Sequence, residues 1–153
     1  MLAQEKINIK NKRAEFEFEI IDRFVAGIVL SGSEIKAIRD GGGSINEAFC
    51  MMRDGEIFIK NMTIPEYSHG AYANHIPSTL RKLLLTKREL RRIDAKIREK
   101  GLSVIPIRLF ISERGFAKLE IGLGRGKKKF DKRESLKEKE NKREMDRVMK
   151  KYR

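Results

Sequence analysis

The last residues of the chain, 125–153, are too charged and too poor in apolar side chains to fold by themselves. They hold fourteen Lys/Arg and six Asp/Glu, a net charge of +8 out of +13 for the whole chain. Ordering one residue costs roughly 1–2 kcal/mol of backbone entropy, which this segment cannot offset by burial. We therefore expect residues 125–153 to form a basic tail, disordered or a frayed helix when free, that orders on a polyanionic partner.

The remaining residues, 1–124, are enough for one domain with a single modest core. Strongly alternating or apolar segments bounded by turn residues predict six short strands. Asp54-Gly55 predicts a tight hairpin between two of them, and Pro106 inside another predicts an edge or a bulge. The predicted strands span residues 15–23, 24–31, 48–53, 56–61, 103–111 and 116–123.

Two helices interrupt these strands. Ser33 is the expected N-cap of a short helix over 34–39, which Gly41 to Gly43 end. Thr86 and Glu89 form a capping box for a helix over 87–100, closed by Gly101. The outer face of this second helix is rich in Lys and Arg, which fits a solvated surface and RNA contact about equally well. Short antiparallel strands with embedded helices predict a mainly β fold, a small closed antiparallel barrel of the oligonucleotide-binding type.

The sequence contains none of the motifs that carry common catalytic chemistry. Serine nucleophile elbows, HExxH and CxxC are absent, and acidic residues occur singly among bases. We read Cys50 as a small buried hydrophobe rather than a reactive thiol. His69 and His75 have too few companion ligands for a metal site. We therefore expect neither an enzyme nor a bound cofactor or metal.

Charge and hydropathy limit where the protein works and what it binds. The pI near 10 points first to nucleic acid and second to an anionic membrane. No apolar run approaches the ~20 residues of a transmembrane helix, and the N-terminus lacks the apolar region of a signal peptide. A single cysteine also suits a reducing compartment. We expect a cytoplasmic RNA-binding protein with no membrane partner, monomeric when free.

Phe130 is the one aromatic residue at the root of the tail. It lies between Lys127-Lys128-Lys129 and Lys132-Arg133. An exposed aromatic flanked by cations suits base stacking with phosphate pairing. The alternative is that Phe130 pins the tail to the barrel. Residues 1–14 leave a similar choice between a flexible leader and a basic arm on the RNA face.

Several stretches, taken together, resemble the SmpB family, the tmRNA-binding small protein B of bacterial trans-translation. Their order and spacing match the family from about residue 8 to residue 140. In the first half of the chain they are residues 11–14 (NKRA), 26–39 (AGIVLSGSEIKAIR), 54–56 (DGE) and 75–77 (HIP). In the second half they are residues 81–85 (RKLLL), 89–90 (EL), 101 (G), 104–106 (VIP), 126–128 (GKK), 131–133 (DKR) and 136–138 (LKE).

The resemblance implies that the protein binds the tRNA-like domain of tmRNA (SsrA RNA), in particular its elbow. It further implies delivery of tmRNA to stalled ribosomes, with the tail in the empty mRNA channel near the decoding centre. The tmRNA face carried over from the family comprises Asn11, Lys12, Arg13, Glu34, Lys36, Arg39, His75, Arg81, Lys82, Leu84 and Thr86. The ribosomal face comprises Lys127, Lys128, Phe130, Asp131, Lys132 and Arg133.

The chain departs from the family pattern at three places. Ser78-Thr79-Leu80 lacks a second basic residue common there, Thr86 replaces Asn or His, and Phe130 replaces His. A structural ribosomal protein or a non-specific single-stranded RNA-binding protein is the alternative function. A polybasic membrane-surface protein is disfavoured because the apolar stripe of the tail is short and lacks Trp and Phe.

Overall fold

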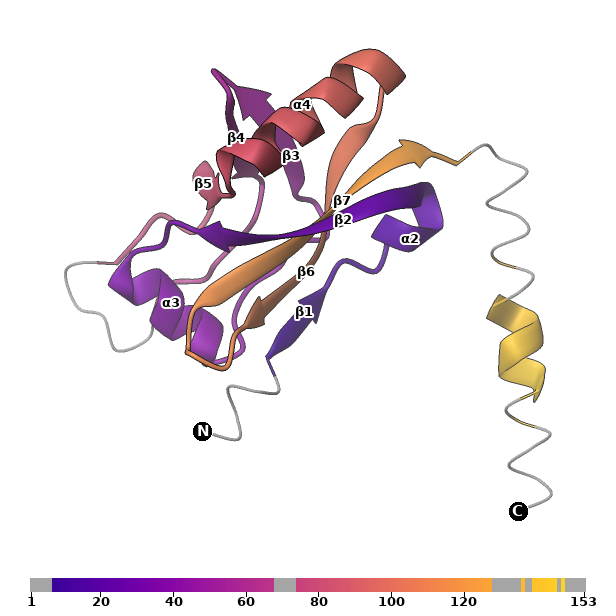
Figure 1. Cartoon of the computed structure of the whole chain (residues 1–153). Coiled ribbons are helices and arrows are strands. Elements are labelled where there is room, and N and C mark those ends of the chain that lie inside the picture. The colour runs from indigo at the N-terminus through magenta and orange to yellow at the C-terminus, as the bar shows by residue number, and fades with distance from the viewer. Residues whose placement is uncertain (1–6, 68–73, 128–135, 137–138, 146, 148–153) are drawn as a thin grey trace.

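The computed structural model describes residues 7–67, 74–127, 136, 139–145 and 147 (Figure 1). Within them a seven-stranded sheet carries three helices before the tail, and residues 139–145 are helical. In chain order the elements are β1 (Asn8–Lys10), α2 (Ala14–Glu17), β2 (Phe18–Ile28), α3 (Gly32–Arg39), β3 (Phe49–Arg53), β4 (Glu56–Lys60), β5 (Arg81–Leu84), α4 (Lys87–Lys100), β6 (Ser103–Ile111) and β7 (Ala117–Gly126).

The sheet is antiparallel and open. Its strand order is β1-β6-β7-β2-β5-β4-β3, and the hydrogen-bond ladder among the described residues does not return from β3 to the other end. The mainly β class is confirmed, but the closed barrel is not. β1 pairs with residues 108–110 of β6, whereas β3 approaches β6 without forming a ladder. A cavity of about 380 Å³, lined by side chains of both strands, occupies the place where such a ladder would close the barrel.

The strand boundaries differ from the expectation in β2, β1 and β5. The two strands predicted over 15–23 and 24–31 are one strand, β2, preceded by the short helix α2. The register shift between Ile20 and Asp22 bends this strand without ending it. β1 lies within residues 1–14, which were expected to be a flexible leader or a basic arm, and β5 lies in a segment without a predicted strand. Both are only three or four residues long, so their own sequence carries little strand signal.

The predicted hairpin turn at Asp54-Gly55 and the predicted bulge at Pro106 are both present in the structure. Asp54 and Gly55 both have positive φ, 52° and 77°, as a type I′ hairpin turn between β3 and β4 requires. Pro106 lies at a register shift between β6 and β7, so the bulge is confirmed, and β6 is an interior strand rather than an edge.

The helix caps are set by short-range hydrogen bonds. Thr86 and Glu89 form the expected capping box of α4, and Gly101 ends that helix in the left-handed conformation. α3 begins two residues earlier than expected: Ser31, not Ser33, is its N-cap, and Glu34 completes the box. Both serines precede the apolar residues of α3, but only Ser31 has the matching Glu three residues later.

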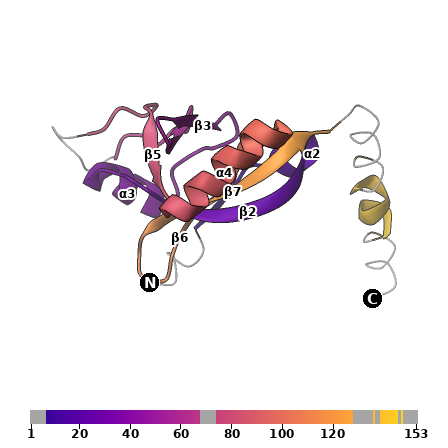
Figure 2. The ribbon, with the colours of Figure 1, turned by 45° about the horizontal axis from the view of Figure 1, so that its top comes forward.

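The core lies on one face of the sheet, and α4 runs alongside β2 and β7 (Figures 1 and 2). Leu90 and Ile93 on its inner face belong to the main buried cluster with apolar side chains from most strands. On the same side, Asp22 of β2 pairs with Arg92 at 2.8 Å and Lys96 at 3.3 Å. α4 is therefore fixed to β2 by both packing and charge.

Two glycines in β7 allow close strand packing. A Cβ on Gly122 would lie 2.9 Å from side-chain carbons of Ile107 and Ile20. At Gly124 it would lie 2.7 Å from the carbonyl oxygen of Glu19. β7 continues to Gly126, and the N–H of Lys127 donates to the carbonyl of Glu17 at 2.8 Å. The sheet therefore extends slightly beyond residue 124, the expected end of the folded domain, which is called the body below.

Candidate RNA interface

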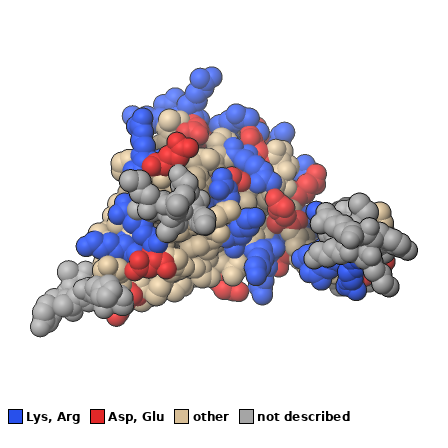
Figure 3. Space-filling view, turned by 90° about the horizontal axis from the view of Figure 1, so that it is seen from below, with Lys and Arg blue, Asp and Glu red and all other residues tan. Residues whose placement is uncertain are grey.

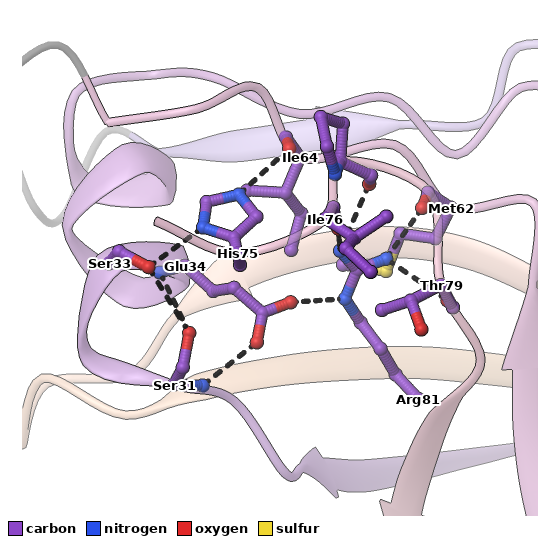
Figure 4. Close-up of polar contacts among 10 residues, drawn as sticks. Ser31, Ser33, Glu34, Met62, Ile64, His75, Ile76, Thr79 and Arg81 are labelled. Carbon is purple, nitrogen blue, oxygen red and sulfur yellow. Dashed lines mark hydrogen bonds and ion pairs between the residues drawn. The ribbon is translucent and has the colours of Figure 1, made fainter. Parts of the chain in front are cut away.

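The predicted tmRNA face contains a buried ion pair between α3 and β5. The guanidinium Nε of Arg81 donates to Oε2 of Glu34, and the two residues are only 3% and 6% exposed (Figure 4). The other carboxylate oxygen of Glu34 accepts from the backbone N–H of Ser31 at 2.8 Å. Burial opposes ionisation of Glu34, but the hydrogen bonds from Ser31 and Arg81 outweigh it and lower the pKa of its carboxyl.

Arg81 also holds the segment that precedes it. Its Nη1 donates to the carbonyls of Met62 at 2.6 Å and Thr79 at 3.3 Å. Its Nη2 donates to the carbonyls of Pro77 at 3.0 Å and Ile76 at 3.4 Å. A single side chain therefore donates to four backbone carbonyls, one of which, that of Pro77, also accepts from the N–H of Ile64 at 2.9 Å. These bonds fix the path of residues 76–79.

His75 makes a second link between this segment and α3. Its Nδ1 is 2.9 Å from the hydroxyl of Ser33, and its Nε2 is 2.9 Å from the carbonyl of Ile64 (Figure 4). Because a carbonyl only accepts, Nε2 carries the proton and Nδ1 accepts from Ser33. Glu34 and Arg81 thus lie inside the scaffold, and the half-buried His75 joins it through these two contacts. Their predicted contact with RNA stays a prediction, and in this structure they position their neighbours.

Five other residues of the predicted tmRNA face lie at or near the surface. The ammonium of Lys36 lies 5.8 Å from the ring centre of Tyr67, and Nη2 of Arg39 donates to the carbonyl of Gly115 at 3.0 Å. Lys82 lies 3.7 Å from the carboxylate of Glu56, and Thr86 caps α4. Leu84 is 51% exposed. These side chains are available for contact, which those of the buried pair are not.

Two N-terminal members of the predicted tmRNA face, Lys12 and Arg13, lie beside the start of the tail and not beside α3 and β5. Asn11 donates its amide to the carbonyl of Pro106 at 2.9 Å and thereby joins β1 to the bulge of β6. Lys12 and Arg13 line one cavity of about 580 Å³ together with Lys127, Lys139 and Lys142. The structure thus groups Lys12 and Arg13 with Lys127 of the predicted ribosomal face. The other members of that face, Lys128, Phe130, Asp131, Lys132 and Arg133, lie outside the described residues.

Another cavity, a groove beside α3, is lined both by exposed residues of the predicted tmRNA face and by residues that were not predicted from the sequence. Arg39 and Leu84 line a cavity of about 380 Å³ with Arg114, Phe116 and Lys118 of the β6–β7 turn and of β7. Phe116 is 63% exposed. The available signal was an aromatic residue just after a turn, with a cation two residues away on each side. Viewed from below, Lys and Arg side chains, with some Asp and Glu among them, surround uncharged surface (Figure 3).

Other kinds of site find little support in the described part of the chain. No group of three or more His, Cys, Asp or Glu is placed there to hold a metal ion. Burial raises the pKa of the Cys50 thiol to about 12, so the thiol is protonated and unreactive near neutral pH. No described helix is long and apolar enough to span a membrane.

Comparison with known proteins gives consistent matches over most of the chain. A family model described as SmpB protein matches residues 8–151. An SsrA-binding protein of Christiangramia forsetii is 51% identical over 146 residues, covering 95% of this chain and 93% of that protein. An SsrA-binding protein of Phocaeicola vulgatus is 54% identical over 144 residues, covering 94% and 96%.

One solved structure matches the fold as well as the sequence. It is described as "tmRNA-SmpB: a journey to the center of the bacterial ribosome", with a TM-score of 0.66 and 40% identity. The match covers 85% of this chain and 94% of the solved one.

Proposed function

The chain belongs to the SmpB protein family, and on this premise we propose that it is an RNA-binding adaptor of trans-translation. It binds tmRNA through the tRNA-like domain, delivers it to stalled ribosomes and enables tagging of the nascent peptide. The observation that carries the proposal is the family match over residues 8–151, which includes both the body and most of the tail. The names of the curated relatives and of the solved structure support the two partners, tmRNA and the ribosome.

The surface chemistry of the body supports a polyanionic partner. The groove between α3, β5 and the β6–β7 turn carries three cations, Arg39, Arg114 and Lys118, and no acidic residue among the side chains that line it. The buried pair of Glu34 and Arg81 fixes the elements beneath this surface. A rigid, shaped face can distinguish a folded RNA from a flexible one, because the preformed geometry saves ordering entropy on binding.

The tail has a different role in this proposal. It carries most of the net charge of the chain and offers few side chains for burial. In the empty mRNA channel it replaces the missing codon–anticodon pairing near the decoding centre, where it lies along ribosomal RNA. The cavity that groups Lys12, Arg13 and Lys127 supports placing the N-terminal arm beside the tail root.

The alternative is a structural ribosomal or non-specific RNA-binding protein whose cations neutralise phosphates of any RNA. Such binding weakens steeply with salt, with a log–log slope of roughly −4 to −5 for about six phosphate contacts. Recognition of a folded elbow adds contacts that do not depend on counterion release. The two functions therefore differ most at near-physiological salt.

We expect the full-length protein to prefer the tRNA-like domain of tmRNA by about a hundredfold over an unrelated structured RNA of equal length. This ratio corresponds to about 2.7 kcal/mol at roughly 1.4 kcal/mol per decade. The measurement is a competition titration at near-physiological salt, with the second RNA as unlabelled competitor. Equal competition by the two RNAs would contradict the proposed function and favour the non-specific alternative.

A further inference from the structure

We propose that Phe116 is the stacking platform for an unpaired nucleobase of the bound RNA, with Leu84 beside it and Arg39, Arg114 and Lys118 holding the adjoining phosphates. This inference rests on the proposed function and adds to it Phe116, Arg114 and Lys118, which the resemblance to the family did not supply. The platform is the groove lined by Gly27, Ile28, Leu30, Ile35, Arg39, Leu84, Arg114, Gly115, Phe116, Ala117 and Lys118.

The groove has an apolar floor that is open to solvent. Phe116 is 63% exposed and Leu84 51% exposed, while the neighbouring Ile28 and Ala117 are buried. The absence of a side chain at Gly27 leaves room beside Leu84, because a Cβ there would meet Leu84 carbons at 3.4 and 3.6 Å. The cavity of about 380 Å³ lies within the size range of small-ligand sites. Phe116 and Leu84 are exposed in the same groove and so form an apolar patch rather than one isolated residue, and such patches mark interaction sites.

The turn before Phe116 is held in one conformation. The N–H of Phe116 donates to the hydroxyl of Ser112 at 3.2 Å, and its carbonyl accepts from the N–H of Ser112 at 2.8 Å. Gly115 takes a φ of +87°, and its carbonyl accepts from Nη2 of Arg39 at 3.0 Å. These bonds fix the backbone under the ring and tie the turn to α3. A fixed backbone places the ring for stacking at little entropic cost on binding.

The positive charges around the groove favour a nucleotide as its ligand. In the part of the chain that the structure describes, none of Arg39, Arg114 and Lys118 forms an ion pair. The residues that line the groove include no Asp or Glu. An aromatic face within a ring of unpaired cations matches a nucleotide, which presents a flat base and a negative phosphate together. A purely apolar partner that covered the groove would remove water from these cations without offering them a negative charge.

The test uses the absence of tryptophan from the chain. Phe116→Trp keeps a flat ring and introduces a single tryptophan at the platform, whose emission can be excited selectively over that of the three tyrosines. We expect this variant to bind the tRNA-like domain within about twofold of the unmodified protein, and the RNA to quench its emission. Phe116→Ala, which removes the ring, is expected to weaken binding about tenfold, in the range measured for base–aromatic stacking.

Phe49 supplies the matched control, because it is 43% exposed on β3 and does not line this groove. Phe49→Trp and Phe49→Ala should show neither quenching by the RNA nor loss of affinity. The unmodified protein is tested in the same assay against an unrelated RNA, so a failure of the proposed function appears there as equal binding of both RNAs.

Three outcomes would overturn the inference even if the unmodified protein selects the tRNA-like domain. The first is full affinity in Phe116→Ala, and the second is unquenched emission from Phe116→Trp at saturating RNA. The third is quenching by an acidic polypeptide such as polyglutamate but not by RNA, which would assign the groove to a protein partner.

Discussion

Replacing Arg81 with methionine is expected to lower the free energy of unfolding by about 3–5 kcal/mol, the range for breaking a buried ion pair. The substitution leaves the carboxylate of Glu34 buried without its cation. It also removes the Arg81 donor from the backbone carbonyls of Met62, Ile76 and Thr79. Methionine fills much of the volume, so the loss reflects charge and hydrogen bonding more than a cavity. Urea unfolding followed by circular dichroism measures the change in midpoint.

Two variants separate this explanation from a general effect of losing an arginine. Arg53→Met removes an exposed cation from β3 and should change the free energy of unfolding by no more than about 0.5 kcal/mol. Adding Glu34→Gln to Arg81→Met removes the buried charge while glutamine can still accept from Ser31, so part of the stability should return. A loss of less than 1 kcal/mol in Arg81→Met would mean that water reaches and solvates Glu34.

Ending the chain after Lys127 is expected to abolish peptide tagging on stalled ribosomes while lowering affinity for the tRNA-like domain by less than tenfold. The cut leaves β7 and its pairing with β2 intact, because the strand ends at Gly126. It removes twelve Lys/Arg and six Asp/Glu of the tail but none of the groove beside α3. Tagging is measured by peptide addition on ribosomes stalled at the end of an mRNA, and affinity by titration at near-physiological salt.

A scrambled tail is the matched control for the truncation. It keeps the composition and net charge of residues 128–153 but changes their order. If the tail acts through its sequence in the mRNA channel, scrambling should also abolish tagging. If scrambling restores tagging, the tail is only an electrostatic anchor. Equal losses of RNA affinity and tagging after truncation would contradict separate roles for the body and the tail.

Local features of the chain were predictable where neighbouring residues alone decide the conformation. The Asp54-Gly55 hairpin and the capping box of Thr86 and Glu89 are both in place, as is Gly101 at the end of α4. Each depends on hydrogen bonds or dihedral angles within a few residues. The N-cap of α3 was misplaced: Ser33 was expected, whereas Ser31 is the observed cap and its backbone N–H donates to the carboxylate of Glu34. The local signal was present here too, because Ser31-x-x-Glu34 has the spacing of a capping box.

Features decided by distant residues were not predictable to the same extent. β1 is a strand because β6, about a hundred residues away, offers it a partner, and β5 depends similarly on β2 and β4. The approach of β3 to β6 without a ladder leaves the sheet open, which no local pattern indicates. The resemblance to the family placed Arg81 and Leu84 on one face, yet one is buried and the other exposed.

By itself, the sequence determined the mainly β class, the tight turns, the helix caps and the strongly basic character of the tail. These follow from alternation, backbone preferences and net charge, all of which act over short distances or over the whole composition. The tertiary structure alone decided that Arg81 pairs with Glu34, 47 residues earlier, and that Phe116 joins Arg39 and Leu84 in one groove. Arg81 and Leu84 owe their places to the register of β5, because a shift of one residue would turn each side chain to the opposite face of the sheet. Their partners come from α3 and the β6–β7 turn, which only the tertiary fold brings beside β5.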